Sequence, residues 1–150
     1  MNADAEYTTA LINAETELRR LFQHTSSCLA IGAGYGQREI EFVKRFMTNI
    51  ESLTAVEPAA DCAAGLTAAL QEHLPKVHSV VHQEKIQSWK GVGEAVDAVL
   101  MLHVLHYLTH DERCALMGRL FNEKVSKCFF YIFNEIPMEK SCLQNTDKKS

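Results

Sequence analysis

Short apolar runs alternate with amphipathic segments along most of this chain of 150 residues. The runs are bounded by glycine, proline or polar residues, which is typical of buried strands. We expect strands at residues 28–31, 53–56, 77–81, 98–102 and 128–133. The run at 98–102 is the most continuously apolar, as expected of a strand that is covered on both faces of a parallel sheet.

Apolar residues at helical spacing lie between these runs. We expect helices over residues 8–23, over a segment containing Ile40, Val43 and Phe46, over residues 59–74, and from Thr109 onward. The last helix is expected to begin at a capping box, because Glu112 follows Thr109 by three residues. Strands that alternate with helices predict an α/β fold, with a mostly parallel sheet between two layers of helices.

Composition indicates one globular domain, since 47% of the residues are apolar and 23% are charged. We divide it into an N-terminal helix and lead-in (1–27), an α/β core (28–136) and a polar tail (137–150). The net charge of −4, with scattered basic residues, argues against nucleic-acid binding. The N-terminus is acidic and no apolar run approaches the roughly 20 residues of a membrane span, so we expect a soluble, cytoplasmic protein.

A glycine-rich loop, Gly32-Ala33-Gly34-Tyr35-Gly36, follows the first predicted strand. Alternate glycines let a ligand approach the backbone N–H groups without a Cβ in the way. A dinucleotide site has the spacing G-x-G-x-x-G and would need a glycine at Gln37, so the loop argues against NAD and FAD. A glycine-rich turn that binds nothing is the alternative interpretation.

An acidic residue, Glu57, ends the second predicted strand, 25 residues after Gly32. A carboxylate at this place can accept hydrogen bonds from both hydroxyls of a ribose. Considered alone, Glu57 would be explained as a charge that stabilises the start of the next helix. Together with the glycine loop, it favours a ribose site.

With these two motifs the sequence resembles the class I S-adenosylmethionine-dependent methyltransferases, whose loop is G-x-G-x-G and whose second strand ends in an acidic residue. The resemblance covers residues 28 to about 133. Stretches at 30–34, 56–60, 82–84 and 97–108 are most similar to the histamine N-methyltransferase branch of the family. The resemblance implies a Rossmann-like sheet and S-adenosylmethionine as the cofactor.

The resemblance also implies which residues bind that cofactor. They are Gly32, Ala33, Gly34, Gly36, Glu57, Pro58, Gln83, Glu84, Ile86 and Leu102. The loop would pass close to the methionine and ribose, Glu57 would hold the ribose hydroxyls, and the residues after the third strand would flank the adenine. Many members of the family have an acidic residue two positions before the first glycine, where this chain has Ala30.

His103 follows the fourth predicted strand, where the family places a polar residue close to cofactor and acceptor. The resemblance implies methyl transfer to a small-molecule amine such as histamine, and the His103 imidazole would orient that amine or take its proton. A hydrogen-bonded structural histidine is the alternative. His106 and His110 follow at positions that do not predict a metal site, because a strand-to-loop junction breaks helical spacing and no carboxylate pair completes a ligand set.

A complete class I methyltransferase has seven strands, the last two of which form a hairpin, whereas only 17 residues follow Phe133. We therefore expect the sheet to lack this hairpin and its fifth strand to be an exposed edge at which two copies form a homodimer. The alternative to an enzyme is a non-catalytic protein of the same fold that binds the cofactor weakly or pairs through that edge.

Overall fold

The computed structural model describes residues 3–91, 95–102, 104, 107–120 and 125–130. Its helices are α1 (Ala3–Asn13), α2 (Glu15–Phe22), α3 (Gln37–Phe46), α4 (Ala60–His73) and α5 (His110–Leu120). Its strands are β1 (Ser27–Ile31), β2 (Ser52–Val56), β3 (His78–His82), β4 (Val96–Met101) and β5 (Val125–Phe130). None of these helices is long and apolar enough to cross a membrane.

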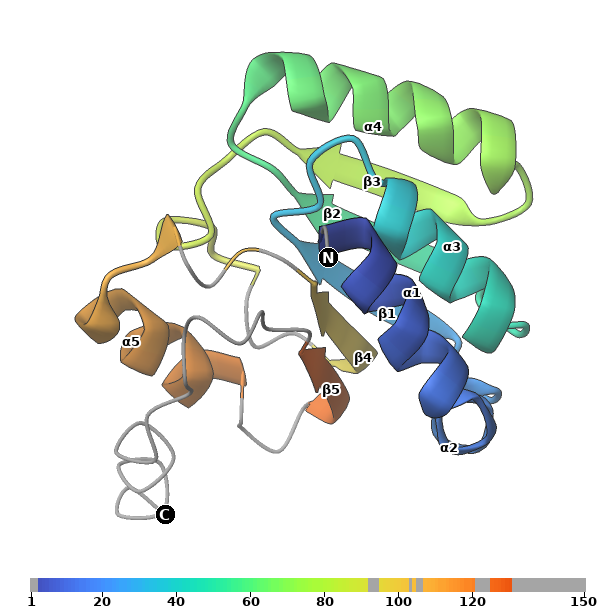
Figure 1. Cartoon of the computed structure of the whole chain (residues 1–150). Coiled ribbons are helices and arrows are strands. Elements are labelled where there is room, and N and C mark those ends of the chain that lie inside the picture. The colour runs from blue at the N-terminus through green and yellow to red at the C-terminus, as the bar shows by residue number, and fades with distance from the viewer. Residues whose placement is uncertain (1–2, 92–94, 103, 105–106, 121–124, 131–150) are drawn as a thin grey trace.

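The strands form one sheet in the order β3-β2-β1-β4-β5, and every neighbouring pair is parallel. The chain passes from β1 through β2 to β3 at one edge and then returns to the other side of β1 with β4 (Figure 1). The strand order therefore reverses between β1 and β4. In open parallel sheets, ligands bind beyond the carboxyl ends of the strands at such a reversal.

Helices cover both faces of the sheet, which confirms the three-layer arrangement. One face, with Ala30 and Leu100, packs against α1, α2, α3 and α4. The other face, with Leu29 and Val99, packs against α5. Alternate side chains of β1 and β4 thus enter two separate clusters, as the pleat of a strand requires.

A carboxylate joins the amino ends of β1 and β4. Asp97 Oδ2 accepts hydrogen bonds from Ser26 N at 2.9 Å, Ser26 Oγ at 2.7 Å and Ser27 N at 3.2 Å. In return, Ser27 Oγ accepts a hydrogen bond from Asp97 N at 2.9 Å. These bonds fix the register in which Cys28 pairs with Ala98, and so they align the loops at the opposite ends of both strands.

The N-terminal segment forms two helices instead of the single helix predicted over residues 8–23. The helix breaks at Ala14, directly after Asn13, and asparagine is unfavourable in helix interiors because its side chain competes for backbone hydrogen bonds. Each helix buries a pair of residues four positions apart in the same cluster. The pairs are Tyr7 with Leu11 and Leu18 with Phe22.

The fifth strand begins three residues earlier than predicted. The prediction followed the apolar run at 128–133, whereas the pairing with β4 begins at Val96 with Val125 and ends at Met101 with Phe130. The bounds of β5 thus follow its pairing with β4 and not the apolar run in its own sequence. Residues 131–133 and the predicted tail at 137–150 lie outside the described residues.

Candidate functional site

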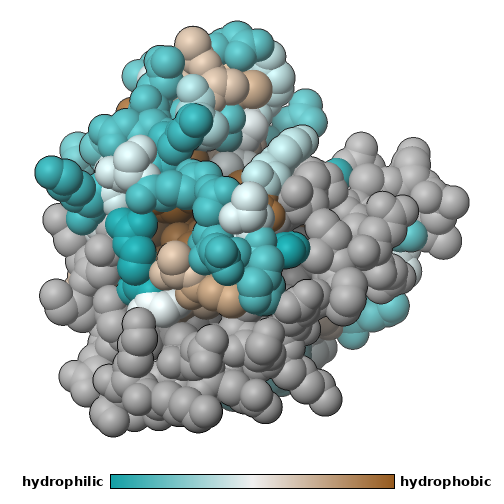
Figure 2. Space-filling view, turned by 90° about the vertical axis from the view of Figure 1, so that its left-hand side faces the viewer, coloured by the Kyte–Doolittle hydropathy of each residue, from teal (hydrophilic) through white to brown (hydrophobic). Residues whose placement is uncertain are grey.

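The loops that follow β1, β2 and β4 lie at the carboxyl edge of the sheet, which is the left-hand side of Figure 1. Figure 2 shows this side of the molecule, where apolar atoms form the floor of a hollow surrounded by hydrophilic side chains. An apolar floor with a few polar groups around it is typical of small-molecule sites.

The glycine loop has a left-handed backbone at each of its three glycines. The φ angles are 63° at Gly32, 58° at Gly34 and 84° at Gly36. A Cβ on Gly32 would lie 2.4 Å from Val104 Cγ2, and one on Gly36 would lie 2.3 Å from Leu66 Cδ1. A Cβ on Gly34 would meet no atom within 4 Å. Packing thus excludes side chains at the outer two glycines, whereas the middle one borders open space.

Glu57 is tied directly to this loop. Its side chain is buried, with 7% of the residue exposed. Oε2 accepts a hydrogen bond from Gly34 N at 3.1 Å, and Oε1 accepts one from Ala59 N at 3.3 Å. A carboxylate oxygen can accept two hydrogen bonds, so each oxygen can take a further donor from a ligand. The two motifs that the sequence placed 25 residues apart form one site.

The residues after β3 differ in burial. Gln83 and Glu84 are exposed, and Ile86 is buried against the cluster beside α5. The Trp89 ring lies 5.4 Å from the ring of His82, which ends β3. Pro58, predicted beside Glu57, is exposed. The segment therefore places one apolar side chain inward and polar side chains at the rim of the sheet.

Arg119, which the sequence did not indicate, holds this segment in place. From α5, its guanidinium donates hydrogen bonds to the carbonyl oxygens of Ile86 at 3.3 Å and Trp89 at 2.6 Å. Gln87 adds a side-chain hydrogen bond to Glu112, and Glu112 forms the predicted capping box with Thr109. Residues 30 positions apart carry no local signal for such a contact, so sequence patterns could not reveal it.

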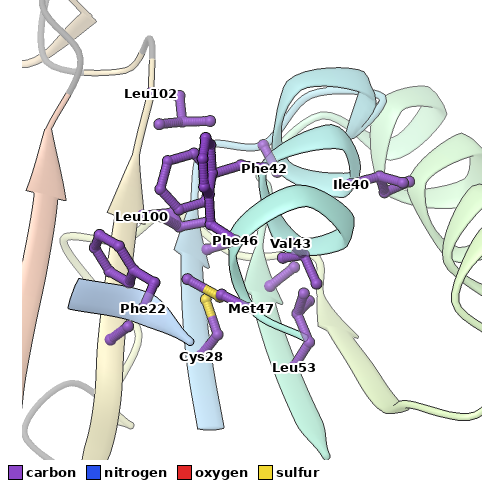
Figure 3. Close-up of a cluster of buried hydrophobic side chains, with 14 of the residues drawn as sticks. Phe22, Cys28, Ile40, Phe42, Val43, Phe46, Met47, Leu53, Leu100 and Leu102 are labelled. Carbon is purple, nitrogen blue, oxygen red and sulfur yellow. The ribbon is translucent and has the colours of Figure 1, made fainter. Parts of the chain in front are cut away.

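The other side of the site is formed by the end of β4. Leu102 is fully buried, and its side chain lies beside Phe42 in the core (Figure 3). The side chain predicted to contact the cofactor thus belongs to the core. His103 lies outside the described residues, and its assignment stays a prediction.

Glu39, in the first turn of α3, is a second buried carboxyl that the sequence interpretation missed. Only 5% of the residue is exposed, and burial raises its pKa to about 7. The charge of Glu57 also raises this pKa, whereas the backbone N–H of Glu39 and the charge of Arg38 oppose the shift. One signal was present, because position 39 falls on the otherwise apolar face of the predicted helix.

The described residues bring carboxylates, backbone N–H groups and a helix N-terminus together. The carboxylates suit hydroxyl and cationic groups of a ligand, whereas the N–H groups and the helix N-terminus suit acceptor or anionic groups. Among the residues that the structure describes, no three His, Cys, Asp or Glu side chains lie close enough to hold a metal ion.

No protein-family model and no curated protein matches this sequence. Solved structures do match. One is magnesium protoporphyrin IX methyltransferase from Synechocystis PCC 6803 with bound S-adenosylmethionine, at 13% identity over 97% of this chain and 66% of that chain, with a TM-score of 0.65. Another is the N-methyltransferase NodS from Bradyrhizobium japonicum WM9, at 14% identity over 91% of this chain and 80% of that chain, also with a TM-score of 0.65.

A third similar structure is coclaurine N-methyltransferase bound to N-methylheliamine and S-adenosylhomocysteine. It is 17% identical over 87% of this chain, with a TM-score of 0.62. The chain spans 37% of that protein and 66% of the Synechocystis enzyme, less than two thirds of either length. At these identities the comparison concerns the fold alone. This chain has the Rossmann-like fold of the class I S-adenosylmethionine-dependent methyltransferases.

Proposed function

We propose that this chain binds S-adenosylmethionine at the carboxyl edge of its sheet and acts as a cytoplasmic methyltransferase for a small-molecule amine. The observation that carries the proposal is the contact between the two motifs. Glu57 lies against the glycine loop through its hydrogen bond from Gly34 N, next to open space at that glycine. An acceptor for the ribose hydroxyls and a backbone cradle are thus available at one place.

The residues present fit this cofactor. Glu57 would accept the ribose hydroxyls with the unused capacity of its two oxygens. The loop from Gly32 to Gly36 would pass along the methionine and ribose, and the segment of Gln83, Glu84 and Ile86 would flank the adenine. When bound, S-adenosylmethionine supplies an electrophilic methyl group. The remaining task of the protein is to hold the acceptor in line with it.

For the acceptor side, we assign His103 as the residue that orients the amine and takes its proton, because it lies two positions after the end of β4 in the sequence. Two of the similar structures are N-methyltransferases by name, and the sequence resembles the histamine N-methyltransferase branch. Histamine is therefore the first acceptor to assay. Loss of turnover in His103→Ala with unchanged cofactor affinity is expected, and unchanged turnover would contradict this role.

Calorimetric titration of the purified chain with S-adenosylhomocysteine tests the cofactor site, with NADH as the negative control. We expect a dissociation constant in the micromolar range and no NADH binding. Glu57→Ala should weaken binding by at least about tenfold, because a charge-assisted hydrogen bond contributes about 1.5–3 kcal/mol. Glu51→Ala, at the opposite end of β2, is the matched control. A folded wild-type chain that binds no S-adenosylhomocysteine would overturn the proposal.

A second candidate function is a non-catalytic protein that pairs through its sheet edge. It is favoured by the position of β5 at the end of the strand order in the described part of the chain. Strand edges carry unpaired backbone groups and serve as pairing sites. Light scattering across a wide concentration range would detect a concentration-dependent dimer. A monomer at every concentration excludes pairing through this edge.

A further inference from the structure

Glu39 is a buried carboxyl in the first turn of α3, where the helix N-terminus favours a negative charge. It lies on the same face of α3 as Phe42, Val43 and Phe46, which point toward the sheet (Figure 3). Glu39 is one turn closer to the glycine loop than Phe42 and Val43. An apolar side chain at this position would bury its surface without the penalty of desolvating a charge.

No described side chain compensates that penalty. Among the residues that the structure describes, none forms an ion pair or a side-chain hydrogen bond with Glu39, and Arg38 acts on it through charge alone. Its backbone N–H is the hydrogen-bond donor to the carboxylate. Burial therefore dominates and raises the pKa to about 7. Buried ionisable groups without a partner are concentrated at functional sites.

Glu39 also belongs to the candidate site by position. It follows Gly36 by three residues, and the charge of Glu57 contributes to the rise of its pKa. Glu57 in turn accepts the hydrogen bond from Gly34 N. Two buried carboxyls thus lie beside one loop, and in the described part of the chain neither is paired with a lysine or an arginine. The N-terminus of α3 and the charge of Arg38 act on Glu39, but no described side chain places a cation in contact with either carboxyl.

We propose that Glu39 provides the negative charge for the cationic methionine end of the bound cofactor. This inference rests on the function proposed above. The methionine end of S-adenosylmethionine carries a sulfonium, an ammonium and a carboxylate group, so its net charge is positive and either cationic group can lie against Glu39. A cation placed next to a buried carboxyl stabilises its ionised form.

Titration calorimetry of Glu39→Gln tests the proposal, because glutamine keeps the shape of the side chain and removes its charge. The ligands are S-adenosylmethionine, S-adenosylhomocysteine and adenosine. Glu41→Gln, exposed on the same helix, is the matched control. We expect Glu39→Gln to weaken S-adenosylmethionine binding by about tenfold or more, with adenosine binding and Glu41→Gln unchanged.

The titration with S-adenosylhomocysteine, the reaction product, identifies which cationic group of the cofactor interacts with Glu39. S-adenosylhomocysteine keeps the ammonium group but has an uncharged sulfur. A loss confined to S-adenosylmethionine assigns the sulfonium as the partner of Glu39, and an equal loss with both ligands assigns the ammonium. Affinity within about twofold of wild type for both ligands, or an equal loss with adenosine, overturns the inference. A wild-type chain that binds neither ligand instead overturns the proposed function.

Discussion

The three glycines of the loop have the same backbone conformation but different surroundings, so their substitution separates folding from binding. Gly34→Ala places a Cβ in open space, at a left-handed φ that is unfavourable by about 1–2 kcal/mol for an L-residue. We expect this variant to fold and to lose cofactor binding, because the new Cβ occupies the space next to the loop. Urea unfolding and calorimetry measure the two effects.

Gly32→Ala is the comparison for that prediction. Its Cβ would lie 2.7 Å from the Cβ of Val104, which is buried and stiff. Overpacking costs about 1–3 kcal/mol and adds to the left-handed strain. Gly32→Ala should therefore be less stable than Gly34→Ala. Wild-type cofactor affinity in Gly34→Ala would show that no ligand approaches this part of the loop.

Glu39 should make stability depend on pH. Its folded pKa of about 7 lies above the ordinary value of 4.5, so the folded state holds the proton more tightly than the unfolded state. The stability that this proton contributes is fully present below pH 4.5 and is lost as pH rises through about 7. Burial causes the raised pKa, the charge of Arg38 opposes it, and the charge of Glu57 adds to it.

Glu39→Gln should remove this dependence. Relative to wild type, we expect the free energy of unfolding of the variant to rise by about 2–3 kcal/mol between about pH 5 and about pH 8. Denaturant titrations at both pH values, with Glu41→Gln as the reference, provide the measurement. Parallel pH profiles for wild type and Glu39→Gln would mean that this carboxyl is solvated in the folded protein.

At the scale of elements, local patterns located every helix and strand that the structure describes, but they located element boundaries less well. The capping box at Thr109 and Glu112 set the start of α5 correctly, because its hydrogen bonds join residues three positions apart. The start of β5, in contrast, depends on its pairing with β4. Boundaries set by tertiary contacts leave little trace in local hydrophobicity.

The same distinction applies to the site. The loop and Glu57 could be predicted because their motifs are local and parallel strands bring their ends together at one edge. Glu39 produced a signal, a charge on an apolar helix face, that was not recognised. Arg119 produced no such signal, because the carbonyl groups that it binds lie 30–33 residues away in the sequence.

At the scale of the whole molecule, Arg119 connects α5 on one face of the sheet with the segment after β3 at the carboxyl edge. Arg119→Met should release the carbonyl groups of Ile86 and Trp89 while keeping most of the apolar part of the side chain. Trp89 is the only tryptophan of the chain, so its fluorescence reports on this segment alone. We expect red-shifted emission and greater quenching by acrylamide, because Trp89 becomes more exposed to water.

Arg119→Met should weaken the binding of every ligand that contains adenine, because the segment after β3 is proposed to flank the adenine. Arg119→Met should weaken adenosine and S-adenosylhomocysteine by similar factors of about three to ten, since both ligands carry the adenine. Glu39→Gln, in contrast, should spare adenosine, so the two variants separate the adenine end of the site from the methionine end. Arg113→Met, on the same helix, is the control. Unchanged Trp89 emission and unchanged adenosine affinity in Arg119→Met would show that the packing of Ile86 against α5 is enough to hold the segment.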